Sequence, residues 1–181
     1  MIIVMGLPGS GKSTVLSVAQ EKGWKVLNYG TLMMDIASTE FGVKDRDSLR
    51  TLPADKQKRV QAKVGHMLSN ERERKVILDT HCSINTPKGY LPGLPFSFLG
   101  ALYVERLVLL TAPAEDILKR RKTDKTRVRD AQSKASIIEH DEMNRIYLGA
   151  YSVITGAPSI IITNPNGKID EVRQKFASLL E

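Results

Sequence analysis

Residues near the N-terminus have the spacing of a loop that binds phosphate groups. Gly6, Gly11, Lys12 and Ser13 satisfy the pattern G-x-x-x-x-G-K-[ST], directly after an apolar run over residues 2–5 and before a predicted helix. In such a loop the backbone N–H groups point at phosphate oxygens, the lysine reaches the β and γ phosphates, and the serine hydroxyl binds Mg²⁺. The pattern has about a 1% chance of arising at random in a chain of this composition. We therefore expect a nucleoside triphosphate site with Mg²⁺, the alternative being a glycine turn that only caps a helix.

One acidic and one histidine side chain follow a later apolar run. Asp79 ends a predicted strand over residues 76–79. In proteins with a phosphate-binding loop, an acidic residue at this position lies near Mg²⁺ and its waters. His81 could donate to a phosphate or hold a metal-bound water. The alternatives are a turn or N-cap aspartate and a structural histidine. Cys82 is the single cysteine, which excludes an intramolecular disulfide, and we expect it to be a small buried residue.

Basic residues are concentrated in one short stretch of the chain. Residues 119–129 contain seven basic side chains and one acidic one, a balance of +6 out of a net charge of +7. Cations at a helix C-terminus complement the helix dipole, but that effect is worth only about 0.3 to 1 kcal/mol each. An arginine aligned on a transferring phosphoryl group is worth about 10³ to 10⁵ in rate. The cluster therefore predicts phosphate-binding arginines, namely Arg120, Arg121, Arg127 and Arg129, while Lys122 and Lys125 are expected to be solvated.

A second anion site is expected opposite the first. Gly30 and Thr31 follow a predicted strand and begin a predicted helix, and a helix N-terminus is a natural anion site. Arg46 and Arg50 lie in the segment that follows this helix. The alternative for both arginines is ordinary surface charge.

The elements that must position these residues alternate between strands and helices. Five short apolar runs predict strands over residues 2–5, 24–28, 76–79, 107–110 and 159–163. Helical patterns separate them, so parallel strands with right-handed crossovers are expected. The sequence thus predicts an α/β chain with a three-layer P-loop NTPase fold, a five-stranded parallel sheet and a short lid.

Several local details of the helices are predicted as well. The helix over residues 31–41 is expected to turn Leu32, Ile36 and Met33 inward, and the helix after Pro53 to bury the stripe Val60, Val64, Met67 and Leu68. Ser136 and Glu139 form a capping box for a long helix that reaches about Thr155. The Pro- and Gly-rich passage 86–100 is expected to be a structured loop with at most a short helix.

Composition limits the class of protein. At 181 residues and 41% apolar content, the chain fits one globular domain that needs no metal or disulfide to complete its core. The apolar N-terminus is not a signal peptide because no charge precedes it and glycines interrupt it. Gly156 and Pro158 divide the longest uncharged run into pieces too short to span a bilayer. We expect a soluble, cytoplasmic protein that does not bind membranes.

Two sequence patterns of GTPases are missing, which limits the classes of reaction that the phosphate loop could serve. An Asp-x-x-Gly turn of GTPase switches is missing after Asp79, and no Asn-Lys-x-Asp sequence that reads guanine occurs. The chain is also too short for the extra domains of a motor ATPase. A small kinase remains, and a nucleoside monophosphate acceptor would need no strong general base because its phosphate is already ionised. A kinase for another monophosphate or a small alcohol, and a nucleotide-dependent RNA-binding protein, stay open as alternatives, although nucleic acid is not the expected partner.

With these motifs in place, the chain resembles the archaeal-type adenylate kinases nearly from end to end. The resemblance rests on residues 6–14 (GLPGSGKST), 28–31 (NYGT), 79–81 (DTH) and 86–95 (TPKGYLPGLP), and on the arginine segments around 45–50 and 120–129. The passage 86–95 is the most diagnostic of these. By this resemblance the helical segment over about 30–70 lies on the AMP side, and a short lid spans about 121–131.

The resemblance implies reversible, Mg²⁺-dependent phosphoryl transfer from ATP to AMP, giving two ADP for adenine nucleotide homeostasis, in the cytoplasm. It places ATP on residues 6–14, that is Gly6, Leu7, Pro8, Gly9, Ser10, Gly11, Lys12, Ser13 and Thr14, with Mg²⁺ on Ser13 and, through water, Asp79. Lys12, Arg120, Arg127 and Arg129 would be catalytic, and the AMP side would include Thr31, Arg46, Arg50, His81 and Thr86. The chain carries DTH where bacterial adenylate kinases carry an arginine loop, so the resemblance leaves His81 or Thr86 to hold the AMP phosphate in its place.

The resemblance also implies a homotrimer. Family trimers assemble through helical surfaces, and the long helix here is apolar on more than one face, at Ile137, Ile138, Tyr147, Leu148, Tyr151 and Ile154. The alternative is that both faces belong to the core of one chain.

Overall fold

Five parallel strands form the central sheet of the computed structural model, which describes residues 1–71, 73–123 and 133–181, without the side chains of Asp47 and Arg50. The strands are β1 (Ile2–Gly6), β2 (Lys25–Asn28), β3 (Val76–Thr80), β6 (Arg106–Thr111) and β7 (Ser159–Thr163). Their order is β2-β3-β1-β6-β7, and every neighbouring pair is parallel. All five predicted strands are confirmed, to within a residue or two at each end.

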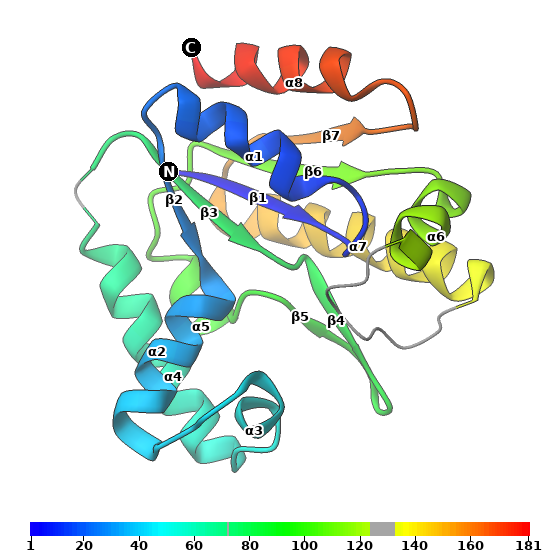
Figure 1. Cartoon of the computed structure of the whole chain (residues 1–181). Helices are drawn as coiled ribbons and strands as arrows, with labels where there is room; N and C mark the ends of the chain where they lie inside the picture. The colour runs from blue at the N-terminus through cyan, green and yellow to red at the C-terminus, as the bar shows by residue number, and fades with distance from the viewer. Residues whose placement is uncertain (72, 124–132) are drawn as a thin grey trace.

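Helices cover both faces of this sheet, which confirms the three-layer prediction. One layer holds α1 (Lys12–Glu21) and α8 (Ile169–Ala177), continued by a 3₁₀ turn over Ser178–Leu180. The other layer holds α2 and α4 beside α7 (Figure 1), whose bounds are given below. β1 shows why two layers are needed: Ile2 and Val4 pack with the α1/α8 layer, whereas Ile3 and Met5 pack with the opposite layer.

A helical segment follows β2 and carries part of the predicted second anion site. It comprises α2 (Tyr29–Phe41), α3 (Arg46–Arg50) and α4 (Ala54–Ser69). α2 buries Tyr29, Met33 and Ala37, while the predicted core residues Leu32 and Ile36 are only partly buried.

The prediction that Met67 belongs to the buried stripe of α4 is wrong. Val60, Val64 and Leu68 are buried as expected, but 51% of Met67 is exposed and Gly65 is buried instead. Phe98 packs directly on Gly65, where an added Cβ would lie 2.6 Å from the Phe98 Cβ. This close approach turns the buried face of α4 toward Gly65 and leaves Met67 outside.

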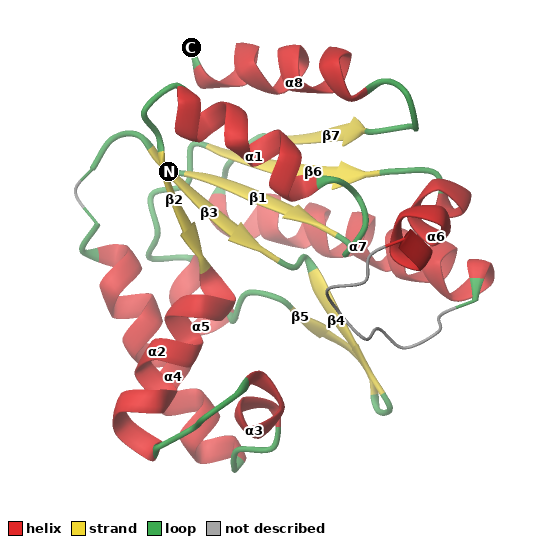
Figure 2. Cartoon of the chain, in the orientation of Figure 1, coloured by secondary structure: helices red, strands yellow, loops and turns green. Residues whose placement is uncertain are grey.

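The Pro- and Gly-rich passage contains a β-hairpin that the sequence did not indicate. β4 (Ser83–Thr86) pairs with β5 (Gly89–Pro92) in an antiparallel hairpin separate from the main sheet (Figure 2). The predicted short helix is present as α5 (Phe96–Leu99). Four-residue strands with mostly exposed side chains show little alternation, so the hydrophobic pattern could not reveal them.

Two helices flank the basic stretch. α6 (Ala114–Thr123) has Glu115 and Asp116 in its first turn, and α7 (Lys134–Thr155) is the longest helix of the described chain. α7 begins earlier than predicted, because Ser133 rather than Ser136 is the N-cap and its hydroxyl accepts from the Ser136 N–H at 3.1 Å. Its predicted end at Thr155 is confirmed, with Gly156 as the cap.

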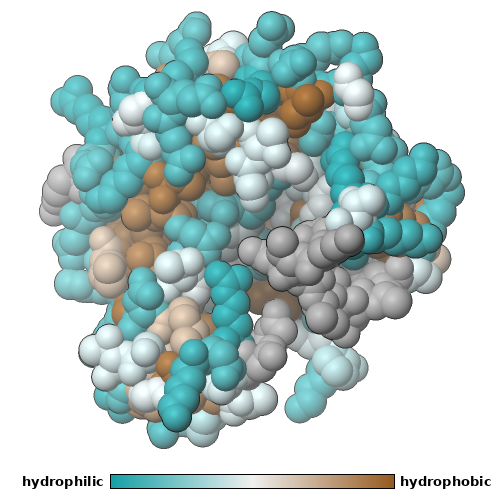
Figure 3. Space-filling model, in the orientation of Figure 1, coloured by the Kyte–Doolittle hydropathy of each residue, from teal (hydrophilic) through white to brown (hydrophobic). Residues whose placement is uncertain are grey.

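Hydrophilic residues cover much of the face that Figure 3 presents. Within residues 1–71, 73–123 and 133–181, no helix combines the length and the apolar character that crossing a membrane would require.

Candidate active site

The predicted phosphate loop joins β1 to α1, as the motif requires. Gly9 and Gly11 have φ values of 93° and 91°, in the left-handed region that favours glycine. A side chain at Gly11 would also collide with the Asn164 amide. α1 begins at Lys12, so the N-terminus of this helix points into the loop, and the side chains of Ser13 and Thr14 are exposed beside it. The loop therefore has the backbone conformation and the exposed hydroxyl groups that a phosphate and Mg²⁺ site needs.

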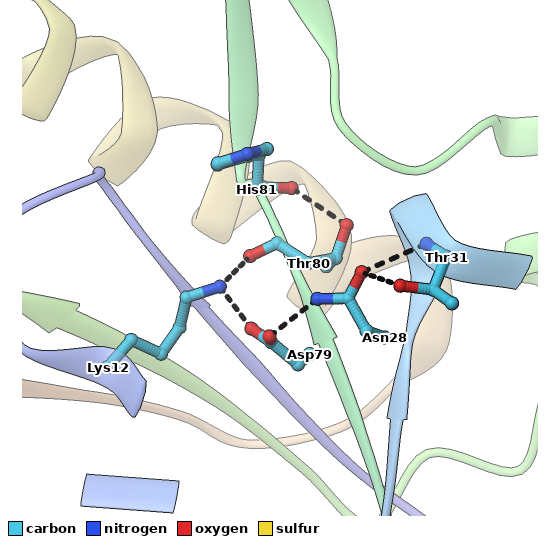
Figure 4. A network of polar contacts seen from close by, with 6 residues as sticks. All are labelled: Lys12, Asn28, Thr31, Asp79, Thr80 and His81. Carbon is cyan, nitrogen blue, oxygen red and sulfur yellow. Dashed lines mark hydrogen bonds and ion pairs between the residues drawn. The ribbon is translucent and has the colours of Figure 1, made fainter. Parts of the chain in front are cut away.

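Asp79 connects the phosphate loop to the second strand. Its carboxylate accepts a hydrogen bond and ion pair from the Lys12 Nζ and a second hydrogen bond from the Asn28 Nδ2 at 2.7 Å (Figure 4). The Lys12 Nζ also donates to the Thr80 carbonyl at 2.8 Å. Asn28 and Asp79 are partners in the β2/β3 register, so parallel pairing places both at the same edge of the sheet. The structure thus brings Lys12 and Asp79 together, as their positions in the sequence predicted.

Asn28 then extends this network to α2. Its Oδ1 accepts from the Thr31 backbone N–H at 3.0 Å and from the Thr31 hydroxyl at 3.2 Å, which makes Asn28 the N-cap of the helix. The amide of Asn28 therefore bridges the acid of the first anion site and the helix start predicted for the second. Sequence reasoning missed this role, although a strand-ending Asn before a predicted helix is a recognisable capping signal.

Burial sets the protonation behaviour of Lys12. The pKa of Lys12 is lowered, because burial disfavours the ammonium, while the charge of Asp79 and its hydrogen bond oppose that shift. Only 14% of the Lys12 side chain and 17% of the Asp79 side chain are exposed. A phosphate entering the loop would give this ammonium a second anionic partner in a partly desolvated place, where charge interactions are strong.

His81 lies just beyond β3, next to this cluster. Although solvent reaches the residue, its pKa is lowered to about 4, first by desolvation from the surrounding protein and then by the Lys12 charge, against an opposing hydrogen bond with the Gly6 backbone. The imidazole is therefore neutral near pH 7 and can offer one donor and one acceptor.

Behind His81, the chain is held by buried polar side chains of α7. The Asn144 Oδ1 accepts from the Ser83 backbone N–H at 3.1 Å and from the Ser83 hydroxyl at 2.7 Å, and the Tyr151 hydroxyl donates to the Cys82 carbonyl at 2.7 Å. Cys82 is 1% exposed, and burial raises its pKa to about 12, which confirms the expectation of a buried, unreactive thiol. These contacts support the end of β3 and the hairpin, and no local pattern in α7 had marked Asn144 as a polar anchor.

Two arginines of the basic stretch reach from α6 to the phosphate loop. Arg120 donates to the carbonyls of Gly9 and Ser10, both at 3.2 Å, and Arg121 donates to the Pro8 carbonyl at 2.8 Å. The Lys122 side chain is exposed, as expected. Lys125, Arg127 and Arg129, with most of the predicted lid, lie outside the described residues.

The predicted AMP-side residues are spread over three elements. Thr31 is in the first turn of α2 with an exposed side chain, and the Arg46 guanidinium reaches from α3 toward the same turn, since a Cβ on Gly30 would lie 4.0 Å from its Nη2. Arg50 ends α3, and the direction of its side chain is not among the described features. Thr86 lies in the hairpin, where its hydroxyl donates to the Gly89 carbonyl at 2.7 Å. The structure thus groups Thr31 and Arg46, whereas the Thr86 hydroxyl is engaged within its own turn.

A further part of the site is the turn after β7. After β7, the buried Asn164 donates from its Nδ2 to the Ser10 carbonyl at 2.8 Å and from its backbone N–H to the Thr111 carbonyl at 2.8 Å. A pocket of about 260 Å³ lies beside it, lined by this turn together with Gly11, Thr14 and Arg120. Contacts between residues so far apart in the chain leave no local signal in the sequence.

Comparison with known proteins agrees with this geometry. A family model described as an AAA domain matches residues 5–138. The adenylate kinase of Methanothermobacter thermautotrophicus is 41% identical, over 100% of this chain and 99% of that protein. The adenylate kinase of Thermoplasma acidophilum is 44% identical, over 98% of this chain and 97% of that protein. The adenylate kinase of Methanocaldococcus jannaschii is 40% identical, over 100% of this chain and 98% of that protein.

Solved structures share the fold at low sequence identity. A shikimate kinase from Acinetobacter baumannii in complex with shikimate superimposes with a TM-score of 0.60 at 19% identity, covering 99% of this chain and 91% of that one. A shikimate kinase from Bacteroides thetaiotaomicron superimposes with a TM-score of 0.59 at 12% identity, covering 99% of this chain and 97% of that one. These likenesses confirm the predicted P-loop kinase fold. With the full-length relatives above, they establish that the chain belongs to the adenylate kinase family.

Proposed function

We propose that this protein catalyses reversible phosphoryl transfer from ATP to AMP, giving two ADP, and so serves adenine nucleotide homeostasis. The observation that carries this proposal is the chain of contacts from Lys12 through Asp79 and Asn28 to Thr31. It joins the phosphate loop to the N-terminus of a second helix at one edge of the sheet, so that the two predicted anion sites are linked through Asp79 and Asn28. Relatives that bear the name adenylate kinase align with the whole chain, which supports the same reaction.

On the donor side, residues 6–14 would hold the ATP phosphates and Lys12 would stabilise charge on the transferring group. Arg120, Arg127 and Arg129 would add positive charge from α6 and from the short lid over about 121–131. On the acceptor side, the helical segment over about 30–70 would supply Thr31, Arg46 and Arg50, with His81 and Thr86 as further contacts to AMP. All of these parts would belong to one domain spanning residues 1–181.

Mg²⁺ would complete the donor site. The donor set present is an exposed Ser13 hydroxyl and the Asp79 carboxylate at the neighbouring strand end, both hard oxygen donors of the kind Mg²⁺ prefers. Within the described residues, no group of three or more His, Cys, Asp or Glu side chains is arranged so that it could hold a metal ion. Such a sparse set fits an ion that retains waters and is shared with the phosphates. Bound there, Mg²⁺ would neutralise charge on the transferring phosphoryl group.

The reaction needs positioning more than acid–base chemistry. A monophosphate acceptor is already ionised near neutral pH, so alignment, charge neutralisation and exclusion of water would provide the rate. The neutral His81 agrees with this view, because it can orient a phosphate oxygen or a water without adding charge.

Measurement of ADP formation from MgATP with AMP, CMP, UMP, GMP and dAMP, and with no acceptor, tests the proposal. We expect turnover largely confined to AMP, since relatives that match the whole chain bear the name adenylate kinase. Turnover only with a different acceptor would retain a kinase and overturn the substrate. ATP hydrolysis without any acceptor dependence would instead favour the nucleotide-dependent RNA-binding alternative. Against that alternative, Arg120 and Arg121 bind phosphate-loop carbonyls and are not spread over an open basic surface.

A cytoplasmic homotrimer assembled through α7 is part of the same proposal. Of the six residues that the sequence suggested for its surface, Ile138 is exposed, whereas the other five are buried or partly buried. Ile137, Leu148 and Tyr151 are buried in the core of the chain, and Tyr147 and Ile154 pack partly against it. The outward apolar positions of α7 are Ile138, Ile146 and Val153, with 43%, 64% and 86% exposure. Ile161 of the edge strand β7 adds to this apolar surface. It pairs in register with Leu109, which packs in the α7 layer, so Ile161 lies on the same face of the sheet as α7.

Replacing Ile146 and Val153 together by glutamate is expected to convert trimers into monomers, because charges would have to be buried between subunits. Mass photometry at working concentration measures the result. The matched control is Tyr103→Glu, at a residue that is 82% exposed and distant in sequence from α7. A wild-type protein that is monomeric throughout, or a trimer that survives the double substitution, would contradict assembly through this surface.

A further inference from the structure

Asp116, Asn166 and Arg120 form a clasp between α6 and the turn after β7. The carboxylate of Asp116 accepts from the Asn166 backbone N–H at 2.8 Å and from the Asn166 Nδ2 at 2.7 Å. One helical turn later, the Arg120 Nε donates to the Asn166 Oδ1 at 2.9 Å. Asp116 and Arg120 thus lie on the same face of α6 and hold both ends of the Asn166 amide.

The clasp determines which way the Asn166 amide points. Its NH₂ faces a carboxylate that can only accept, and its oxygen faces a guanidinium that can only donate. Neither contact survives a flip of the amide. The turn is therefore fixed both at its backbone and at its side chain, which a single hydrogen bond would not achieve.

Through Arg120 the clasp continues to the phosphate loop. The remaining guanidinium nitrogens donate to the Asn164 carbonyl at 2.9 Å and to the Gly9 and Ser10 carbonyls. The pocket of about 260 Å³ next to Gly11 and Thr14 has this turn as one wall and Arg120 as another. The distance between the phosphate loop and the turn, and so the width of the pocket, depends on these contacts.

We propose that Asp116 is a positioning residue for the donor nucleotide: by holding Asn166 it fixes the turn that walls the nucleoside part of ATP. The inference rests on the proposed binding of ATP phosphates at residues 6–14. A pocket that opens beside Gly11 and Thr14, at the start of α1, is where the rest of that nucleotide must lie. Its lining of amides, a guanidinium and the apolar Ile169 suits a planar heterocycle with polar edges.

Two isosteric exchanges and their combination test the clasp. Asp116→Asn places an NH₂ group against the donors of Asn166, and Asn166→Asp places one carboxylate against another, so each disrupts the clasp. Combined, they restore it with donor and acceptor exchanged, since the carboxylate now at position 166 still accepts from Arg120. Glu115→Gln is the matched control, because it removes the same charge from the same helix turn, where Glu115 pairs with Lys134 rather than with the turn after β7.

We expect each single exchange to raise the KM for ATP about tenfold, which corresponds to one or two lost hydrogen bonds. The KM for AMP and kcat should stay within about twofold, and the combined variant should return to within about twofold of the wild type. Glu115→Gln should leave both KM values unchanged. Calorimetric titration with the non-hydrolysable analogue AMP-PNP should show the same pattern in Kd.

Several results would overturn the assignment. An unchanged KM for ATP, an equal rise of both KM values, or a combined variant no better than the single ones would each show that Asp116 does not position the donor. A wild-type protein that binds AMP-PNP but forms no ADP from ATP and AMP would refute the proposed function alone, and the Kd values would still decide the role of Asp116.

Discussion

Replacing Lys12 by alanine is expected to lower kcat by at least about 10²-fold, the size of effect seen when a donor to a developing charge is removed. The Lys12 ammonium lies between the Asp79 carboxylate and the Thr80 carbonyl in a largely desolvated place. An anionic phosphoryl group would therefore meet a charge that is already positioned and weakly screened. Initial rates of ADP formation at saturating MgATP and AMP measure the effect.

The controls must distinguish a loss of catalytic activity from a loss of folded protein. Removing Lys12 leaves Asp79 with the Asn28 amide as its hydrogen-bond donor, so we expect only a small fall in Tm. Assays should run well below the Tm of the variant, recorded by circular dichroism. Lys119→Ala, which removes an exposed lysine of the basic stretch, should retain wild-type turnover. Wild-type turnover by Lys12→Ala would refute a catalytic role for this lysine.

Replacing Asp79 by asparagine is expected to reduce activity by about 10- to 100-fold and to raise the Mg²⁺ concentration needed for half-maximal rate. The amide keeps the size of the side chain and can still accept a hydrogen bond from Lys12 or Asn28. What it loses is the negative charge, which would orient the waters of a bound Mg²⁺. A titration of rate against free Mg²⁺, at fixed ATP and AMP, separates the metal effect from a general loss of activity.

Asp35→Asn is the matched control for this exchange, because Asp35 is an exposed aspartate on α2 outside the cluster of Figure 4. It should reproduce the wild-type Mg²⁺ curve. If Asp79→Asn also reproduces that curve, Asp79 acts in the site only as the partner of Lys12. The Lys12 prediction would then stand by itself.

The centre of the sheet was predictable because β1, β3 and β6 are buried on both faces. Such strands appear as short continuous apolar runs, and helical periodicity between them requires parallel pairing. The hairpin β4–β5 was not predictable by this route, since its short strands are mostly exposed and contain Pro92 and Gly89. Ser133 and Ser136 both offer a capping hydroxyl near the same helix start, and in the structure Ser133 is the N-cap, with its hydroxyl accepting from the Ser136 N–H.

The sequence by itself determined the phosphate loop, because its function depends on backbone geometry within eight consecutive residues and a helix start. It also placed Asp79 at the end of a strand, which is a local feature. Only the tertiary structure decided that Asn28 links Asp79 to Thr31, and that Arg120 and Asp116 hold the turn after β7. These contacts join polar residues that are far apart in the chain. A polar residue in a loop has the same local pattern whether it faces water or a distant partner, so only the folded arrangement distinguishes the two.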